Sequence, residues 1–124
     1  FNGCKMLNFV DLPNGLKKIA GNAFMFCESL ESIELPNTVE SIGTSAFANS
    51  KITYINQPDN LTSVGYKVFA ETPYSDKYSG NIVDSRLMFG EFLVEDYNTG
   101  NSLVIPNGVK GLADKLYQNN PFEE

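Results

Sequence analysis

The chain has 124 residues, of which 42% are hydrophobic and 19% charged, and its net charge is −6 at pH 7. This is enough apolar material for one packed domain. The negative charge disfavours nucleic acid as a partner, because Lys and Arg supply most of the affinity for phosphates. The sequence contains no His, which is the commonest general base and metal ligand. We therefore expect a non-enzymatic protein with no cofactor.

The first part of the chain is built on a repeated unit of 23 residues. When residues 1–23 are aligned with residues 24–46, eight positions are identical. The identical pairs are Phe1/Phe24, Cys4/Cys27, Leu7/Leu30, Leu12/Leu35, Pro13/Pro36, Asn14/Asn37, Ile19/Ile42 and Ala23/Ala46. Self-similarity at a fixed period of roughly 20–50 residues indicates a solenoid. We expect repeats at 1–23, 24–46 and 47–68.

The first repeat predicts a strand over 7–12, a turn at 13–15 and a short helical turn over 22–26. Proline directly after a strand suits a turn, because it cannot donate to the ladder and its φ is preset. The second repeat predicts a strand over 30–35 and a short helix through 46–47, capped by Thr44 or Ser45. We expect 7–12 and 30–35 to pair in parallel.

The third repeat departs from the pattern at Gln57, which stands in a leucine column. Burying an amide without a partner costs roughly 2–7 kcal/mol. Gln57 must therefore be hydrogen-bonded, or this turn of the solenoid must open locally. We take it as the sign that the regular stack is about to be interrupted.

An insertion at about 69–101 follows the third repeat. Apolar runs at 86–89 and 92–95 flank Gly90-Glu91 and predict a β-hairpin, and 98–101 is expected to be a loop. The repeat resumes over about 102–124. The chain contains no apolar run of about 18 residues, so we expect no membrane insertion within it. It begins at a repeat position and not with Met, so we expect a fragment of a longer protein whose exposed first repeat is covered by other sequence, a fused domain or a neighbouring molecule.

The motif Ala-Phe-x-x-Cys-x-x-Leu-x-x-Ile-x-Leu-Pro-x-x-Val-x-x-Ile-Gly, best seen over 23–43, resembles the bacterial BspA-type leucine-rich repeat. The step Thr72-Pro73-Tyr74 and the hairpin after it also resemble an insertion that recurs in this family. The chain departs from the motif at Ser50, in the cysteine column, at Gln57 and at 116–117. The resemblance implies an α/β fold: a right-handed leucine-rich-repeat solenoid with a parallel β-sheet face and short helical turns, interrupted by a β-hairpin insertion. It also implies a secreted or cell-surface protein, and some family members are adhesins.

The candidate partner-binding face consists of the outward positions of the predicted strands. These positions are Phe9, Asp11, Ser32, Glu34, Tyr54, Asn56 and Ser102. An acidic-to-polar row with two aromatic residues suits a basic peptide or a polar glycan. The alternative is a solvated face without a ligand, although an exposed Phe9 favours contact with a partner.

Cys4 and Cys27 share one column in adjacent repeats. Stacking permits the Cα spacing of a disulfide but keeps the Cβ atoms too far apart, and Ser50 comes next in the column. We therefore favour two reduced, buried thiols over a disulfide, and two thiols are too few for a structural zinc site.

Two further motifs carry little weight. Residues 96–100 resemble the start of a calcium loop, but Asn107 stands where an acidic ligand is required, so we expect a turn and no metal site. Asn60-Leu61-Thr62 is a glycosylation sequon, which matters only if a eukaryote secretes the chain.

Together these features predict a binding or adhesion module of a secreted or cell-surface protein. Its partner would be a host or bacterial surface protein or a glycan, held on the sheet face. The alternative is a structural solenoid spacer that presents other domains.

Overall fold

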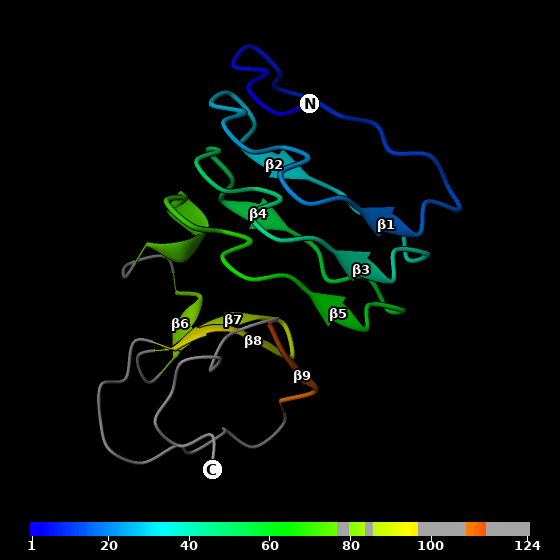
Figure 1. Cartoon of the computed structure of the whole chain (residues 1–124), viewed down its shortest axis with the longest axis vertical. Coiled ribbons are helices and arrows are strands. Elements are labelled where there is room, and N and C mark those ends of the chain that lie inside the picture. The colour runs from blue at the N-terminus through cyan, green and yellow to red at the C-terminus, as the bar shows by residue number, and fades with distance from the viewer. Residues whose placement is uncertain (77–79, 84–85, 97–108, 114–124) are drawn as a thin grey trace.

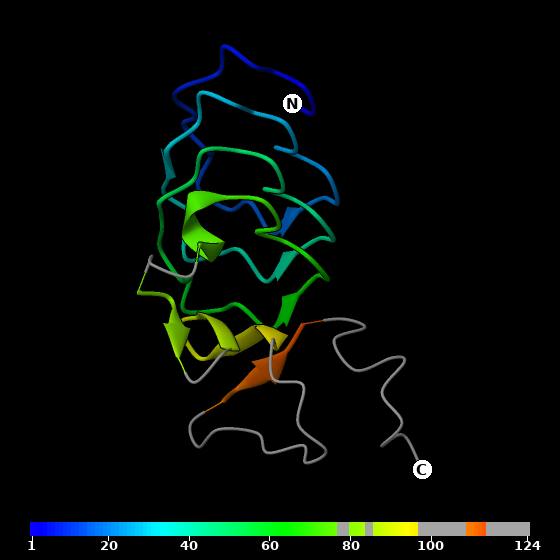
Figure 2. The same cartoon turned by 90° about the vertical axis from the view of Figure 1, so that its left-hand side faces the viewer.

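Residues 1–68 form a stack of similar turns of chain, here called rungs, in the computed structural model (Figures 1 and 2). The structure describes residues 1–76, 80–83, 86–96 and 109–113. Equivalent residues of successive rungs pair in parallel in two separate sheets. This confirms the predicted repeat solenoid with parallel strands. The right-handed sense of the coil stays a prediction.

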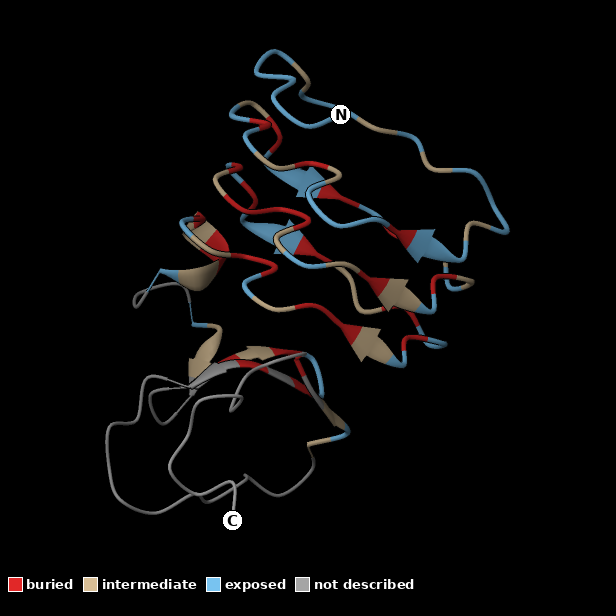
Figure 3. Cartoon of the chain, viewed as in Figure 1, coloured by how far each residue is buried: buried red, intermediate tan, exposed pale blue. Residues whose placement is uncertain are grey.

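One sheet joins β2 (Ser32–Ile33) to β4 (Tyr54–Ile55) in parallel, with Ser32 opposite Tyr54. In each strand the first residue is exposed and the second is buried (Figure 3). This alternation is the one that the sequence predicted for the sheet face.

The predicted strand over 7–12, and with it the parallel pairing of 7–12 with 30–35, is wrong: this segment contains no strand. The first rung is packed less completely than the second. Its column residues are only partly buried, while their counterparts one rung later have at most 3% of their surface exposed. These pairs are Leu7/Leu30, Val10/Ile33 and Leu12/Leu35. A segment covered from one side alone lacks much of the packing that holds a strand in register.

A second parallel sheet consists of β1 (Lys18–Ile19), β3 (Ser41–Ile42) and β5 (Ser63–Val64) in that order. Ile19, Ile42 and Val64 are buried, as the sequence predicted for this column, but the sequence had not predicted strands here. The rungs approach closely just after these strands: a Cβ added to Gly65 would collide with the backbone at Gly43–Thr44. Glycine is therefore required at that position.

The third side of each rung is a turn, and the predicted short helices over 22–26 and 46–47 are wrong. Asn22 and Phe26 have φ of 60° and 59°, and Ser45 and Asn49 have φ of 55° and 57° in the next rung. The N–H groups of these left-handed residues donate to the neighbouring rung, as in the 2.9 Å bond from Asn22 N to Thr44 O. An α-helix would need those N–H groups for bonds within its own segment. In the described ranges the only helix is the short 3₁₀ turn η1 (Pro73–Ser75).

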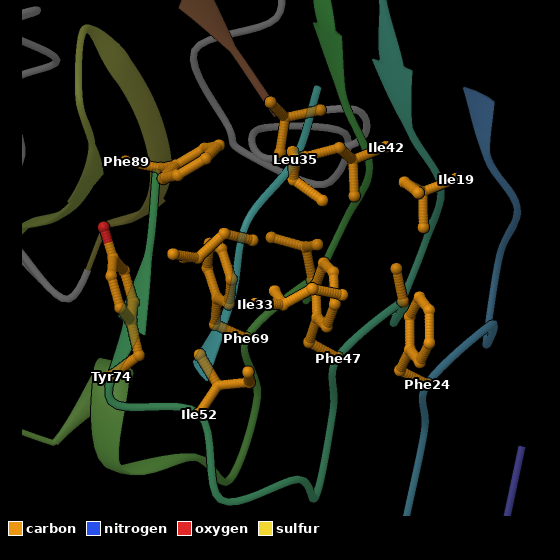
Figure 4. Packing of buried hydrophobic residues seen from close by; sticks show 14 of the residues in the cluster. Ile19, Phe24, Ile33, Leu35, Ile42, Phe47, Ile52, Phe69, Tyr74 and Phe89 are labelled. Atoms are coloured by element: carbon orange, nitrogen blue, oxygen red, sulfur yellow. The ribbon is translucent and has the colours of Figure 1, made fainter. Parts of the chain in front are cut away.

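An aromatic column runs through the core, with each ring stacked on its counterpart one rung away. The ring centroids of Phe1 and Phe24 are 5.5 Å apart, those of Phe24 and Phe47 5.4 Å, and those of Phe47 and Phe69 5.9 Å. The ring planes are nearly parallel, with interplanar angles of 9°, 2° and 14°. Figure 4 shows Phe24, Phe47 and Phe69 in a row. Such pairs add stability beyond the area they bury.

The predicted hairpin is confirmed by the antiparallel pairing of β7 (Arg86–Phe89) and β8 (Phe92–Asp96), with a bulge between Leu87 and Met88. Together with β6 (Ile82–Val83) and β9 (Gly111–Leu112) they form a sheet in the order β6-β7-β8-β9, in which β8 and β9 are parallel. This sheet lies beyond the last complete rung (Figures 1 and 2).

The hairpin packs onto the end of the aromatic column. The rings of Phe89 and Phe69 are edge-to-face with their centroids 5.3 Å apart, and the ring centroids of Tyr74 and Phe69 are 4.4 Å apart (Figure 4). Thr72 caps η1 through a reciprocal pair of bonds with Ser75, and the Tyr74 hydroxyl donates to Met88 O at 3.1 Å. The Thr-Pro-Tyr step therefore joins the last rung to the hairpin.

The predicted loop at 98–101, the resumed strand at 103–105 and the residues at 116–117 lie outside the described residues. The repeat and insertion boundaries stay predictions.

Candidate functional site

The aromatic members of the predicted face are solvent-exposed and lie on either side of Ser32. Phe9 has 74% of its surface exposed and Tyr54 has 52%. Ser32 is exposed, lies opposite Tyr54 in the β2–β4 ladder and lines the same hollow as Phe9. The three outward positions thus follow one another across the first three rungs, with Ser32 on β2 and Tyr54 on β4.

The neighbouring outward column contains Asp11, Glu34 and Asn56. The two carboxylates are exposed, whereas Asn56 is half-buried. The Asn56 amide is occupied, because its Oδ1 accepts from Leu35 N at 2.7 Å and its Nδ2 donates to Leu35 O at 2.9 Å. Asn56 therefore joins two rungs, and its amide is not free for a partner in this structure. Ser102, the remaining predicted member of the face, lies outside the described residues.

Glu34 and Tyr54 interact across the β2–β4 ladder. The negative charge of Glu34 raises the pKa of the Tyr54 phenol, with smaller contributions from burial and from the hydrogen bond between the two side chains. An anionic group therefore lies near an exposed aromatic ring.

A shallow hollow next to Phe9 extends this face toward the start of the strands. It is lined by Asn8, Phe9, Glu28, Ser29, Glu31, Ser32 and Lys51. Glu28 is paired with Lys5 of the preceding rung at 3.1 Å, whereas Glu31 is exposed.

Sequence reasoning did not identify Glu31 or Lys51 as part of the face, because it considered only alternate positions within the predicted strands. The available signal was the repeat itself, because residues in the same column of adjacent repeats lie next to one another.

Met6, which is 88% exposed, is a further apolar side chain in the first rung.

The described part of the chain offers little for catalysis or metal binding. It contains no group of three or more Cys, Asp or Glu placed to hold a metal ion. Both cysteines are free thiols, as expected, but only Cys27 is buried; the expectation that Cys4 is also buried is wrong. Cys4 belongs to the first rung, which lacks a neighbour on one side in this structure. The segment 96–100 that resembles a calcium loop lies almost wholly outside the described residues.

None of the helices in the described ranges is long and apolar enough to cross a membrane.

A comparison with protein families identifies the repeat. Residues 1–123 match the model for the BspA type leucine rich repeat region, in six copies. Searches of the curated proteins and of the solved structures give no significant match. The match covers nearly the entire chain and agrees with the stacked rungs and their parallel ladders. The chain therefore belongs to the BspA-type leucine-rich-repeat family.

Proposed function

We propose that this chain is a non-enzymatic binding module of a secreted or cell-surface bacterial protein, which contacts a surface protein or glycan through the β2–β4 face. Family membership is consistent with this proposal, because BspA-type repeats are typical of surface and secreted bacterial proteins and leucine-rich repeats generally bind rather than catalyse.

The single observation that carries the proposal is the exposed strip of Phe9, Ser32 and Tyr54 beside Asp11 and Glu34. Isolated exposed apolar residues need no explanation, but large aromatic side chains gathered on one face indicate a contact surface. The charged neighbours of these rings would form a polar rim, as at other protein interfaces.

A structural spacer is the second candidate. It would be favoured by a face that is purely charged or that the hairpin covers. The hairpin sheet lies at the end of the rungs and not across β2 and β4 (Figure 1), and the face contains two exposed rings. Both observations favour the binding module.

A solid-phase binding assay against purified matrix and surface proteins and glycans tests the proposal. The double variant Asp11→Ala/Glu34→Ala removes two carboxylates from the face. The variant Glu40→Ala/Asp59→Ala removes two exposed carboxylates outside the β2–β4 ladder and changes the net charge equally. We expect a ligand to lose affinity only for the first variant. Equal binding by wild type and both variants would show that the β2–β4 face is not the binding surface, and no binding by the wild type to any of these ligands would leave the spacer as the better description.

A further inference from the structure

Ser32 leaves a narrow space on the β2–β4 face, between two larger side chains. Ser32 has a small side chain, whereas Phe9 and Tyr54 in the rungs on either side have large exposed rings. The outward column therefore alternates large, small, large. A flat or narrow side chain of a partner could lie over Ser32 and contact ring surface on both sides.

Carboxylates surround this position. Asp11 and Glu34 occupy the adjacent column, and Glu31 precedes Ser32 in the chain; all three are exposed. Among the described residues, the cations near this face are Lys51 in the hollow and Lys5, which is paired with Glu28. Negative charge therefore dominates around the rings, in a chain whose net charge is −6.

We infer that the β2–β4 face recognises an arginine-containing basic peptide, with a guanidinium group over Ser32 between Phe9 and Tyr54 and paired with Glu34. This inference rests on the proposed binding function and names the partner chemistry. Aromatic faces attract cations, and Arg is the side chain found most often in such contacts. Its planar group also forms paired hydrogen bonds with a carboxylate while stacking on a ring.

The arrangement favours a cationic peptide over a neutral glycan. Sugars also stack on aromatic rings, but an uncharged sugar gains nothing from net negative charge around the site. Glu34 is close enough to Tyr54 for its charge to raise the pKa of the phenol, so a carboxylate lies near the ring. A lysine would bring the same charge without the planar fork that pairs with a carboxylate, so arginine is expected to bind more tightly than lysine.

Fluorescence anisotropy with the complete chain tests this inference. The probe is a labelled peptide of alternating Arg and Ser, and matched peptides contain Lys or the neutral isostere citrulline in place of Arg. A neutral β-linked hexasaccharide serves as competitor. The variants are Phe9→Ala, Tyr54→Ala and Glu34→Gln, with Glu40→Gln as control, because Glu40 is an exposed carboxylate paired with Lys17 away from this face.

We expect the Arg peptide to bind, the Lys peptide to bind more weakly and the citrulline peptide not to bind. Phe9→Ala and Tyr54→Ala should each weaken binding by roughly 2- to 5-fold, the range for an exposed cation–ring contact. Glu34→Gln should weaken it by up to roughly 5-fold, the upper range for an exposed ion pair. Glu40→Gln should have no effect. Higher salt should weaken binding, because the charges are exposed.

Several results would overturn the inference: equal binding of the citrulline peptide, equal loss in Glu40→Gln, or efficient competition by the hexasaccharide. The proposed function can survive this failure. If a surface protein or glycan binds wild type but not Asp11→Ala/Glu34→Ala, and the Arg peptide binds all variants alike, the face is functional and only its arginine chemistry is wrong.

Discussion

The side chain of Gln57 meets the turn of the hairpin at Gly90. Its Oε1 accepts a hydrogen bond from the backbone N–H of Glu91 at 3.2 Å, and a Cβ added to Gly90 would collide with the Gln57 amide. Gln57, the polar residue in a leucine column, thus connects the last rung to the inserted hairpin. Of the two alternatives predicted for Gln57, a hydrogen bond or a local opening of the rung, the structure shows the hydrogen bond.

Gly90→Ala is expected to lower the free energy of unfolding by about 2–3 kcal/mol. Gly90 has φ of +55°, a conformation that costs an L-residue roughly 1–2 kcal/mol, and the added methyl group also displaces Gln57. Gly80→Ala is the matched control: its φ is +80° but a Cβ there meets nothing within 4 Å, so only the conformational cost should appear. Urea denaturation measures both.

A double-mutant cycle isolates the contact. In a Gln57→Ala background the collision at Gly90 is absent, so Gly90→Ala should cost no more than Gly80→Ala. An equal cost of Gly90→Ala in both backgrounds would show that Gln57 and Gly90 are not coupled.

The buried phenol of Tyr74 is expected to make the folded protein less stable at alkaline pH. Burial raises the pKa of its phenol to about 12 from the ordinary 10, so the folded state favours the protonated form. The stability that this pKa difference contributes is fully present below pH 10. It is lost as the pH rises from 10 to 12, by up to about 2–3 kcal/mol. Tyr74→Phe should lack this pH-dependent loss.

The measurement is urea denaturation at pH 8, 10 and 11, with Tyr66→Phe as a control for general alkaline effects. At pH 8, Tyr74→Phe should cost about 0.5–1.5 kcal/mol through the lost bond to Met88 O. Parallel pH profiles for wild type and Tyr74→Phe would contradict the assigned burial.

The parts of the fold that the sequence predicted are those set by strong, repeated signals. Leu35, Ile42 and Val64 are buried, as expected for their columns, because apolar residues at a fixed period face one another in a stack. The hairpin was equally clear from two apolar runs around Gly90-Glu91.

The missed features depend on hydrogen bonds between rungs, which leave little trace in one sequence. The strands β1, β3 and β5 contain two residues each, too few for an alternating pattern. The helical prediction over 22–26 failed because Phe26 is left-handed, which an aromatic residue does not suggest. On the candidate site, the exposure of Phe9 and Tyr54 followed from outward alternation, whereas the amide bonds of Asn56 to Leu35 required the structure.

Phe26→Asn is expected to raise the free energy of unfolding by roughly 0.5–1 kcal/mol. Phe26 has φ of +59° and 41% of its surface exposed, and asparagine tolerates this conformation better than phenylalanine. Asn49 occupies the equivalent position one rung later with φ of +57°. Phe26→Ala keeps the strain and loses the ring, so it should not stabilise. Urea denaturation measures both variants, and equal urea midpoints for the Asn and Ala variants would show that the backbone conformation of Phe26 does not limit stability.

The two cysteines should differ in reactivity by roughly tenfold or more, since exposure and thiolate fraction control thiol chemistry. Cys4 is exposed, whereas Cys27 is fully buried and its Sγ donates to Phe1 O at 3.1 Å. Burial also raises the pKa of the Cys27 thiol. A chromogenic disulfide reagent should therefore titrate one thiol rapidly in the native chain and both in denaturant.

Cys4→Ser should abolish the fast phase, and Cys27→Ser should leave it unchanged. Cys27→Ser is expected to fold, because Ser50 occupies the same column and donates to Phe47 O at 2.7 Å. Two rapidly reacting thiols would show that the first two rungs open together. No reactive thiol in denaturant would mean that Cys4 and Cys27 form a disulfide, which would cross-link those rungs directly.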